Sequence, residues 1–513
     1  MRVAISMAKI ALGFFLLANG TLHAEDWPMY GQNLSHTFSN PQSSINPSNV
    51  RSLRLAWTFA ARDAVSASPT VVGGVVYVGS WDGYFYALDA KSGALKWKFR
   101  VDCQYTVLPI PPQCLPLGIK GPPRTTTDGG IITSSAALTG ISTAAGIKRI
   151  VYFGAGKTLY ALNADNGRLL WKRVICGNPD FFACAYNPFD PTRIFSSPAI
   201  FGGLVFVGHT ADGFRGYRGG FEAIDAATGR IRWRFETDPK FNSRGQVIGG
   251  LNRGCGSVWS SAAVDTNAGL VFFGTSDCHG DATPSYHEAV IALEAGSGAL
   301  RWVFRPRKTD TCDFDFGATP NIIDLGNGRF LGIGGKDGTY YLLNRLTQKP
   351  AGELVWHTNV VFGGTLGGFY GGAFDGAHIF GATGIGDLDT LHPTKHCTLD
   401  PRDVSIQEPS MHALNALNGS ILWQKDSNHS FGATSLADGV VFSGLVGIGP
   451  TEGPALKAYN AQTGELLKTF FMPVPPGTGS INSAAIPVGR MLFVTSGNSF
   501  DGKGSGVHAF TLP

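Results

Sequence analysis

One phrase recurs along this chain and constrains its fold more than any other feature. It runs Ala-Leu/Ile-Asp/Asn-Ala-x-x-Gly-x-x-x-Trp, and its copies are ALDAKSGALKW from Ala87, ALNADNGRLLW from Ala161, AIDAATGRIRW from Ala223, ALEAGSGALRW (with Glu) from Ala292 and ALNALNGSILW from Ala413. A looser copy ends at Trp356, and another, AYNAQTGELLK from Ala458, has Lys468 in place of Trp. A fixed repeat of roughly 40 residues or more indicates a propeller or a solenoid.

Residues 68–97 show what one repeat unit contains. Four short β-rich runs are expected there, at Thr70–Val72, Val75–Val78, Tyr84–Leu88 and Ala94–Trp97. The turns between them carry Gly-Gly, Asp-Gly and Ser-Gly, which supply the positive φ angles that hairpins need. Four antiparallel strands of this size make one propeller blade.

A second marker gives the number of blades. Each unit opens with small residues, as expected of an innermost strand near a crowded axis, and these openings begin at Ser66, Thr133, Ser196, Ser260, Gly317, Gly371, Gly432 and Ser483. The last unit ends in VHAFTLP without a fourth strand, whereas the β-like segment Leu53–Ala60 has no blade of its own. The sequence therefore predicts an all-β, eight-bladed β-propeller of four-stranded antiparallel blades, closed by an N-terminal strand so that no sheet edge is exposed.

The tryptophans divide into two groups. Seven of the ten occupy the repeat position and are interpreted as structural, packing one blade against the next: Trp57, Trp97, Trp171, Trp233, Trp302, Trp356 and Trp423. Trp27, Trp81 and Trp259 are left for function.

The N-terminal residues predict export. Residues 1–24 read as a signal peptide, with Arg2 and Lys9 at the positive start, an apolar stretch over Ile10–Leu17 and a cleavage site at Ala24. The alternative is a membrane anchor, but the stretch is short for a bilayer. We therefore expect a periplasmic or secreted propeller over residues 25–513, with no membrane span after signal removal. The net charge of +4 and the lack of a basic run argue against a nucleic-acid partner.

The eight cysteines agree with an oxidising compartment. An even count in an exported chain favours disulfides, and Cys103–Cys114 and Cys176–Cys184 are the local candidates, although spacing does not settle the connectivity. There is no CxxCH for a covalently attached haem and no paired CxxC for a zinc ribbon.

The loop before the fifth blade, TDTCDFDFGATP, concentrates carboxylates. Asp313 and Asp315 are two residues apart, so an extended backbone points both to one side. Neighbouring carboxylates are costly unless a cation or a proton separates them, and hard metal ions take such oxygen ligands. The alternative is a solvated turn in which Asp caps backbone amides. The flanking Phe314 and Phe316 favour the metal or catalytic interpretation.

Three more candidates are expected on the same face, in the fourth and fifth blades. Loops that enter the inner strand and loops that join the second and third strands share one face, where a rigid scaffold presents functional residues. Trp259 precedes the fourth inner strand, at the level Phe316 occupies in the fifth, and Asp277 and Lys336 follow the second strands of these blades. Alone, Trp259 could be core packing and Lys336 a solvated hairpin lysine; their convergence predicts a site.

Five further motifs lie along the chain: DWPMYGQNLSHT at Asp26, VWSSAAVDTNAGLVFFGTSD at Val258, CDFDFGATP at Cys312, GGKDGTYYLLN at Gly334 and GGTLGGFYGG at Gly363. With the repeat, they resemble the quinoprotein alcohol dehydrogenases, and most of all the polyvinyl-alcohol dehydrogenase type. That family binds pyrroloquinoline quinone (PQQ) and a metal ion at the propeller axis. The resemblance therefore implies PQQ and either calcium or a lanthanide ion as cofactors.

The resemblance also implies roles at the cofactor. Trp259 would stack beneath the planar quinone, and Lys336 would hydrogen-bond its reactive oxygens and stabilise the developing oxyanion. Arg124 is a further cofactor-binding candidate. Asp313 matches the catalytic base that takes the proton of the alcohol.

A ligand set for the metal follows from the same resemblance. Asp277 stands where the family has an Asn or Asp ligand, and Asp313 belongs to the same group. Asp315 matches the additional carboxylate that accompanies lanthanide use. Asp212 lies nearest to the place where the family has a Glu ligand, and the adjacent Cys-Cys pair of many members is absent.

The predicted function is the PQQ-dependent oxidation of a small-molecule or polymeric alcohol, secondary alcohols included. Without a CxxCH domain, electrons would pass to a separate cytochrome c or another acceptor. The alternative is a non-catalytic propeller that serves as a protein-interaction scaffold in the cell envelope. That alternative predicts a lipid anchor and no carboxylate cluster, whereas the first cysteine is Cys103 and a cluster is expected. A third possibility is a quinoprotein that has lost its cofactor.

Overall fold

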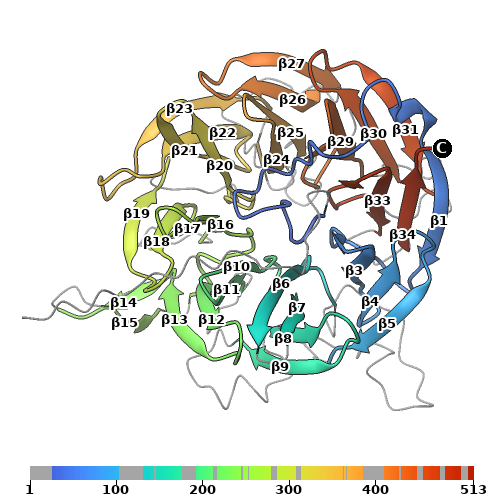
Figure 1. The fold of residues 1–513 in the computed structure, drawn as a ribbon. Coiled ribbons are helices and arrows are strands. Elements are labelled where there is room, and N and C mark those ends of the chain that lie inside the picture. The colour runs from blue at the N-terminus through green and yellow to red at the C-terminus, as the bar shows by residue number, and fades with distance from the viewer. Residues whose placement is uncertain are drawn as a thin grey trace, which may run out of the picture.

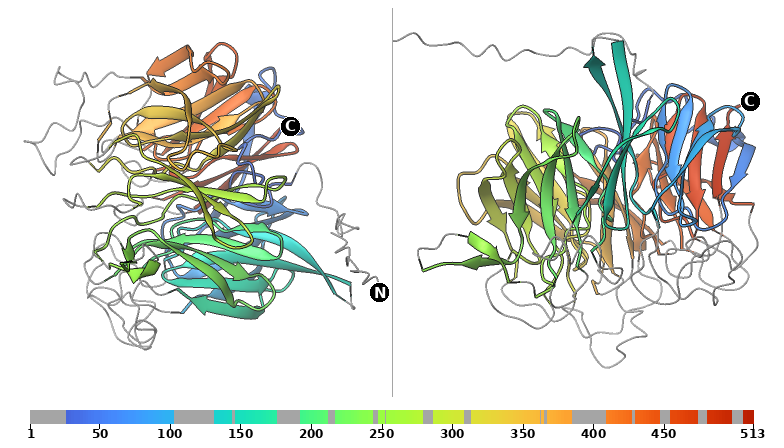
Figure 2. Two further views of the ribbon diagram at one scale, coloured as in Figure 1. Left: turned by 90° about the vertical axis from the view of Figure 1, so that its left-hand side faces the viewer. Right: turned by 90° about the horizontal axis from the view of Figure 1, so that it is seen from below.

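Eight four-stranded antiparallel sheets stand as blades around a central axis (Figures 1 and 2). The computed structural model describes residues 26–102, 131–143, 146–175, 192–211, 217–243, 247–251, 253–278, 286–307, 313–361, 363–364, 367–384, 409–426, 429–446, 454–473, 480–497 and 506–513. The predicted eight-bladed propeller is confirmed.

In blades 1 to 7, four consecutive strands pair in chain order from the axis outward. Blades 1 to 4 contain β2 (Thr70–Val72), β3 (Val75–Gly79), β4 (Tyr84–Asp89) and β5 (Leu95–Arg100); β6 (Ala137–Thr143), β7 (Gly146–Ala155), β8 (Thr158–Asn163) and β9 (Leu169–Val174); β10 (Ala199–Phe201), β11 (Leu204–His209), β12 (Gly220–Asp225) and β13 (Ile231–Glu236); and β16 (Ala263–Asp265), β17 (Leu270–Gly274), β18 (Val290–Glu294) and β19 (Leu300–Phe304). Blades 5 to 7 contain β20 (Asn321–Leu325), β21 (Gly328–Gly334), β22 (Thr339–Asn344) and β23 (Leu354–Asn359); β24 (Gly368–Phe374), β25 (His378–Gly384), β26 (Pro409–Asn415) and β27 (Ile421–Asp426); and β28 (Ser435–Leu436), β29 (Val440–Gly444), β30 (Ala455–Asn460) and β31 (Leu466–Phe471).

Blade 8 is completed by the beginning of the chain. Its inner strands are β32 (Ile486–Val488), β33 (Met491–Ser496) and β34 (Gly506–Thr511), and its outer strand is β1 (Arg54–Ala60). The register pairs Trp57 with Ala509, as the predicted ring closure requires. The other described elements are a hairpin of β14 (Pro239–Phe241) and β15 (Val247–Gly250) and a 3₁₀ helix, η1 (Val50–Ser52). In this part of the chain, no helix has the length and apolarity to cross a membrane.

The repeat tryptophans connect neighbouring blades. The indole N–H of each donates to a backbone carbonyl of the next blade at 2.9–3.2 Å. The pairs are Trp57–Ala90, Trp97–Ala164, Trp171–Ala226, Trp233–Ala295, Trp302–Arg345, Trp356–Ala416 and Trp423–Ala461.

A glycine of the next blade receives six of these indoles. A Cβ on Gly93, Gly167, Gly229, Gly298, Gly419 or Gly464 would lie 2.6–2.8 Å from a ring atom. The conserved spacing of Gly and Trp within the phrase thus reflects a contact between two copies of it, since the Gly of one copy receives the Trp of the preceding copy.

Lys468 preserves the connection where the tryptophan is missing. Its ammonium group donates to the carbonyls of Leu53 and Arg51, at 2.6 and 3.0 Å. These carbonyls precede β1, so the bond joins blade 7 to the strand that completes blade 8.

The N-terminal segment closes the axis on one face. Its backbone exchanges hydrogen bonds with inner-strand residues of blades 1, 2, 4, 5, 6 and 7, through Trp27–Val71, Pro28–Leu138, Leu34–Val264, Ser35–Ile322, Thr37–Phe374 and Phe38–Leu436. In blade 8, the Asn40 side chain donates to the Pro487 carbonyl at 2.9 Å. The DWPMYGQNLSHT motif is therefore a plug across the ring.

The indole contact can be tested with two glycines that share a positive φ. Gly229 (φ 69°) lies under Trp171, whereas Gly203 (φ 78°) has nothing within 4 Å of an added Cβ. Both alanine variants carry the backbone strain, but Gly229→Ala must also displace the indole. We expect Gly229→Ala to cost about 1–3 kcal/mol more than Gly203→Ala in denaturant unfolding; equal losses would contradict the role of the contact.

Acid should weaken the ring closure through His508. Its two ring nitrogens contact the hydroxyls of Thr58 on β1 and Ser496 on β33, at 3.1 and 2.8 Å. Burial lowers the pKa of His508 to about 4. Below about pH 6.5 the unfolded chain therefore binds a proton at His508 that the folded chain does not, and the contribution of His508 to stability falls by about 1.4 kcal/mol per pH unit down to about pH 4.

We expect His508→Gln to reduce this loss, measured as the difference in unfolding free energy between pH 7 and pH 4.5. The exposed His378 provides the control, since His378→Gln should leave the difference unchanged. An unchanged pH dependence in His508→Gln would contradict the assignment.

Candidate functional site

Five of the predicted site residues lie on one face. Trp259 precedes β16 and Asp277 follows β17, whereas the hairpin that joins these strands lies at their opposite ends. Asp313 and Asp315 precede β20, and Lys336 follows β21 in the same way. The structure therefore brings together the residues that the sequence predicted for blades 4 and 5.

The three aspartates form a compact oxygen cluster. One carboxylate oxygen of each of Asp277, Asp313 and Asp315 lies within 4.8 Å of the others, the one such group of metal-ligating side chains found among the described residues. Asp315 is the organising member: one of its oxygens accepts from the backbone N–H of Asp277 at 2.7 Å and the other from the indole of Trp259 at 3.2 Å. The cluster and the aromatic floor are thus joined through one buried carboxylate.

Lys336 lies against the cluster. Its ammonium nitrogen is 2.7 Å from Asp313 and 3.5 Å from Asp315, and its backbone N–H donates to the Asp315 carbonyl at 2.9 Å. Glycines of the GGTLGGFYGG motif cover the lysine turn closely, because a Cβ on Gly363 or Gly368 would overlap its backbone. The lysine is therefore not the solvated hairpin residue of the alternative interpretation.

The charges of the site shift its pKa values. Burial, followed by the carboxylate of Asp315, raises the pKa of Asp313 to about 8, although Lys336 opposes this. For Lys336, burial favours the neutral amine, but the neighbouring carboxylates outweigh burial and raise its pKa, so it remains an ammonium ion. Three carboxylates facing one ammonium leave an excess of negative charge when all are ionised.

Trp259 lies over the next blade. A Cβ on Gly317 would overlap its ring, so the glycine at the start of blade 5 is required for the position of the indole. The prediction that Trp259 corresponds to Phe316 was wrong by one residue. Val258 and Phe316 are the true counterparts. The N–H of Val258 donates to the His209 carbonyl and that of Phe316 to the Thr275 carbonyl, both at 3.1 Å, and each side chain packs on a glycine of the preceding blade.

Arg307 connects the two loops of blade 5. Its guanidinium donates to the Phe314 carbonyl at 3.1 Å, covers the Phe314 ring at 4.8 Å and pairs with Asp337. Phe314 separates Asp313 from Asp315, and Asp337 follows Lys336. The guanidinium therefore holds the carboxylate loop and the lysine turn in a fixed relation.

A disulfide connects Cys255 to Cys278, beside Asp277. Next to it, the N–H of Gly256 donates to the Asp277 carbonyl at 3.0 Å, and the N–H of Ser276 donates to the Ser257 carbonyl at 2.8 Å. The loop of blade 4 that carries Asp277 is thus attached to the chain that enters the same blade. The predicted pairs Cys103–Cys114 and Cys176–Cys184 lie outside the described residues, as do Asp212 and Arg124.

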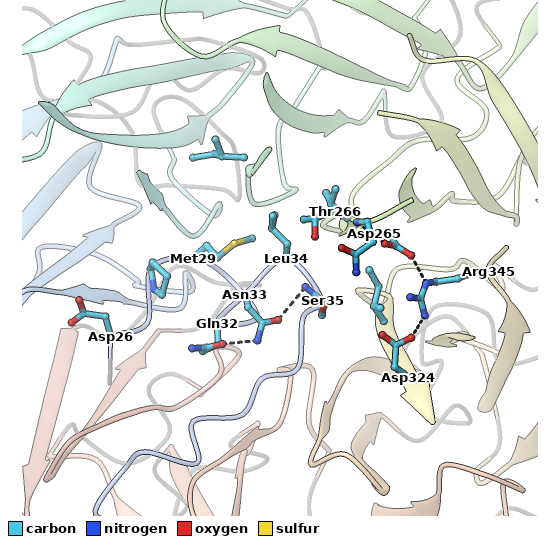
Figure 3. Close-up of a pocket in the computed structure, with 15 residues that line it drawn as sticks. Asp26, Met29, Gln32, Asn33, Leu34, Ser35, Asp265, Thr266, Asp324 and Arg345 are labelled. Atoms are coloured by element: carbon cyan, nitrogen blue, oxygen red, sulfur yellow. Dashed lines mark hydrogen bonds and ion pairs between the residues drawn. The ribbon is translucent and has the colours of Figure 1, made fainter. Parts of the chain in front are cut away.

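A separate cavity of about 640 Å³ lies on the opposite face, between the N-terminal plug and blades 3 to 5 (Figure 3). Its main charged group, Arg345, is already paired with Asp265 at 2.6 Å and with Asp324 at 2.5 Å. None of the predicted site residues that the structure describes lines it. The charge of Arg345 is thus neutralised by carboxylates of blades 4 and 5, and this cavity differs in that respect from the carboxylate cluster at the other end of the axis.

Comparison with known proteins decides the family. A family model described as glucose/ethanol/alcohol dehydrogenase, β-propeller domain (PQQ) matches residues 27–358. The chain belongs to this family. The resemblance to the quinoprotein alcohol dehydrogenases, inferred from the motifs, is thereby confirmed. The predicted class of enzyme, a quinoprotein alcohol dehydrogenase, is confirmed with it.

Individual relatives of this PQQ family member are distant. A polyvinylalcohol dehydrogenase of Pseudomonas sp is 24% identical, over 92% of this chain and 73% of its own length. One of Sphingopyxis sp. (strain 113P3) is 25% identical, over 83% of this chain and 64% of its own length. A lupanine 17-hydroxylase [cytochrome c] of Pseudomonas sp is 24% identical, over 67% of this chain and 51% of its own length. The chain thus spans between about half and three quarters of these relatives.

Solved structures agree on the fold. A europium-containing methanol dehydrogenase superposes with a TM-score of 0.68 at 17% identity, covering 96% of this chain and 98% of its own. A quinohemoprotein alcohol dehydrogenase from Comamonas testosteroni gives 0.66 at 19% identity, covering 95% of this chain and 80% of its own.

The described residues fit the cofactors of a PQQ family member. Three carboxylates, which carry an excess of negative charge when all are ionised, are donors that suit a hard cation of charge two or three. The half-buried indole of Trp259 lies over Gly317 and donates to Asp315, and an aromatic ring of this kind could stack against a planar quinone. Lys336 supplies an ammonium donor beside both.

The sequence did not indicate three features of this site. Arg307 lies before the carboxylate loop and carries no motif, and the partner of Cys255 could not be identified from spacing. Tyr370 belongs to the quoted GGTLGGFYGG motif, but its place beside Trp259 follows from the arrangement of the blades around the axis. Aligning the inner strands on the residue that packs on the previous blade would have placed Tyr370 at the same level as Trp259.

Removing the disulfide should weaken metal binding. In the variant Cys255→Ser/Cys278→Ser, the Asp277 loop keeps its backbone bonds but loses its covalent tether, so we expect terbium affinity to fall about 10-fold or more. The measurement is terbium luminescence sensitised by the tryptophans.

Dithiothreitol is the matched control. It should lower the terbium affinity of the wild type and leave that of the double variant unchanged. Equal affinity in wild type and variant would show that the disulfide does not position Asp277.

Proposed function

We propose that this protein oxidises an alcohol with PQQ and a metal ion, and passes the electrons to a separate acceptor protein. The observation that carries the proposal is the joining of Asp277, Asp313 and Asp315 to Trp259 and Lys336 in one cluster. Asp277, Asp313 and Asp315 would hold the metal, and Trp259 and Lys336 the quinone. When bound, the quinone accepts the two electrons of the oxidation, and the metal ion withdraws electron density from its carbonyl.

Asp313 is the proposed base. Its side chain is 27% exposed, whereas that of Asp315 is 7% exposed, so a substrate hydroxyl can reach Asp313 more readily than Asp315. Lys336, hydrogen-bonded to Asp313, would keep that carboxylate oriented and present a cation to developing negative charge.

The substrate is proposed to be a secondary or polymeric alcohol. Support comes from the two polyvinylalcohol dehydrogenases, which match 92% and 83% of this chain. A separate cytochrome c is the proposed acceptor, in keeping with the name of the lupanine 17-hydroxylase. The predicted signal peptide in residues 1–24 supports a periplasmic or secreted location for the proposed reaction.

Reconstitution tests the proposal against the alternatives. The mature protein is incubated with PQQ and either calcium or lanthanum, and alcohol-dependent reduction of a dye is followed. We expect turnover that requires both PQQ and metal. If neither metal gave turnover or the absorbance of bound quinone, the result would favour the protein-interaction scaffold or a quinoprotein that has lost its cofactor.

Asp315 should distinguish the two metals. A trivalent ion gains more from an added carboxylate than a divalent ion does, because the Coulomb attraction grows with charge. In Asp315→Ala we therefore expect lanthanum-supported activity to fall about 10-fold further than calcium-supported activity. Asp324→Ala, on the opposite face, is the control and should change neither. An equal loss with both metals would mean that Asp315 acts by positioning Trp259 and Asp277.

A further inference from the structure

The eight inner strands present eight equivalent residues at the site end of the axis. In seven blades the residue just before this position donates its N–H to a backbone carbonyl near the end of the preceding blade's second strand, as Ile194, Val258, Phe316, Phe369, Ser430, Ile481 and Val65 do. Most of these residues also pack on a glycine of that blade. With the corresponding residue of blade 2, the axial positions are Ser66, Thr133, Phe195, Trp259, Gly317, Tyr370, Phe431 and Asn482.

Aromatic residues occupy this axial position on both sides of Gly317. Because Gly317 has no side chain, the indole of Trp259 extends across blade 5 and reaches Tyr370 of blade 6, with ring centroids 6.2 Å apart and planes at 42°. Tyr370 in turn contacts Phe431 of blade 7, edge to face, at 5.2 Å. The three rings therefore form one continuous aromatic surface, in which Tyr370 is tilted out of the plane of Trp259.

The backbone before Tyr370 is fixed to the charged half of the site. The N–H of Phe369 donates to the Gly335 carbonyl at 3.2 Å, and Gly368 lies directly on Lys336. Burial raises the pKa of Tyr370 to about 12, so its phenol is a neutral hydrogen-bond donor. Within the described part of the chain, its hydroxyl donates to no side chain or carbonyl. Its neighbours Trp259 and Lys336 are the residues proposed to bind the quinone.

We propose that Tyr370 is a further cofactor-binding residue, whose ring walls the planar site above Trp259 and whose O–H donates to an oxygen at the edge of the quinone. The inference rests on the proposed function. A ring tilted by 42° cannot stack on a ligand that is parallel to Trp259, so it meets the edge of that ligand. PQQ carries carboxylate and carbonyl oxygens around its edge, to which a phenol would be a suitable donor.

The test is PQQ binding to the apoprotein in the presence of calcium, followed by quenching of tryptophan fluorescence. Tyr370→Phe keeps the ring and its contacts but removes the donor. Loss of a hydrogen bond to a charged acceptor should raise the Kd for PQQ about 10-fold or more. Terbium affinity without PQQ should be unchanged, because the carboxylate cluster is intact. Tyr84→Phe, the same change in blade 1, should bind PQQ as the wild type does.

The outcomes separate this inference from the proposed function. Wild-type PQQ affinity in Tyr370→Phe would overturn the role of Tyr370 and leave the proposed function standing. A wild-type protein that binds no PQQ would overturn both. Phe431→Leu is a second variant, which retains the phenol of Tyr370 and removes the ring that supports it. We expect its Kd for PQQ to rise less than that of Tyr370→Phe. A wild-type affinity in Phe431→Leu would count against the aromatic wall.

Discussion

The architecture depends on one contact, made where each outer strand meets the next blade. An indole N–H donates to a carbonyl while its ring covers a glycine, and this arrangement recurs around the ring with a lysine substituting once. Each bond contributes only about 1 kcal/mol. Its larger effect is geometric, because a directional bond over a residue without a side chain permits one orientation of each blade relative to its neighbour.

That fixed orientation is what makes a site from residues far apart in the chain. Equivalent positions of successive blades reach the axis at the same level, so Trp259 and Tyr370, separated by 111 residues and a whole blade, form a ring–ring contact. The loops beyond the strands lack this register. There the chain uses other constraints: the Cys255–Cys278 bridge beside Asp277, and Arg307 between Phe314 and Asp337.

Much of this was predictable because a repeat is a local signal. Strand order, blade number and closure by the segment with Trp57 follow from comparing copies of one phrase, and the carboxylate loop with Lys336 follows from placing motifs on that frame. The predicted equivalence of Trp259 with Phe316 was wrong by one residue, since the small residues that open the inner strands begin at slightly different points in each blade. The partner of Cys255 was not predictable, because its distance to Cys278 is set by the way the chain returns to blade 4.

The sequence by itself determined the propeller and its eightfold count, because both depend on residue types at fixed spacings, and its motifs carried the resemblance to the PQQ family. Only the tertiary structure decided which oxygen of Asp315 faces Trp259 and which faces Asp277, that Gly317 leaves room for an indole from the neighbouring blade, and that Tyr370 lies beside this indole. The physical reason is that these are contacts between blades. They depend on the rotation of one sheet against the next, which a single copy of the repeat does not encode.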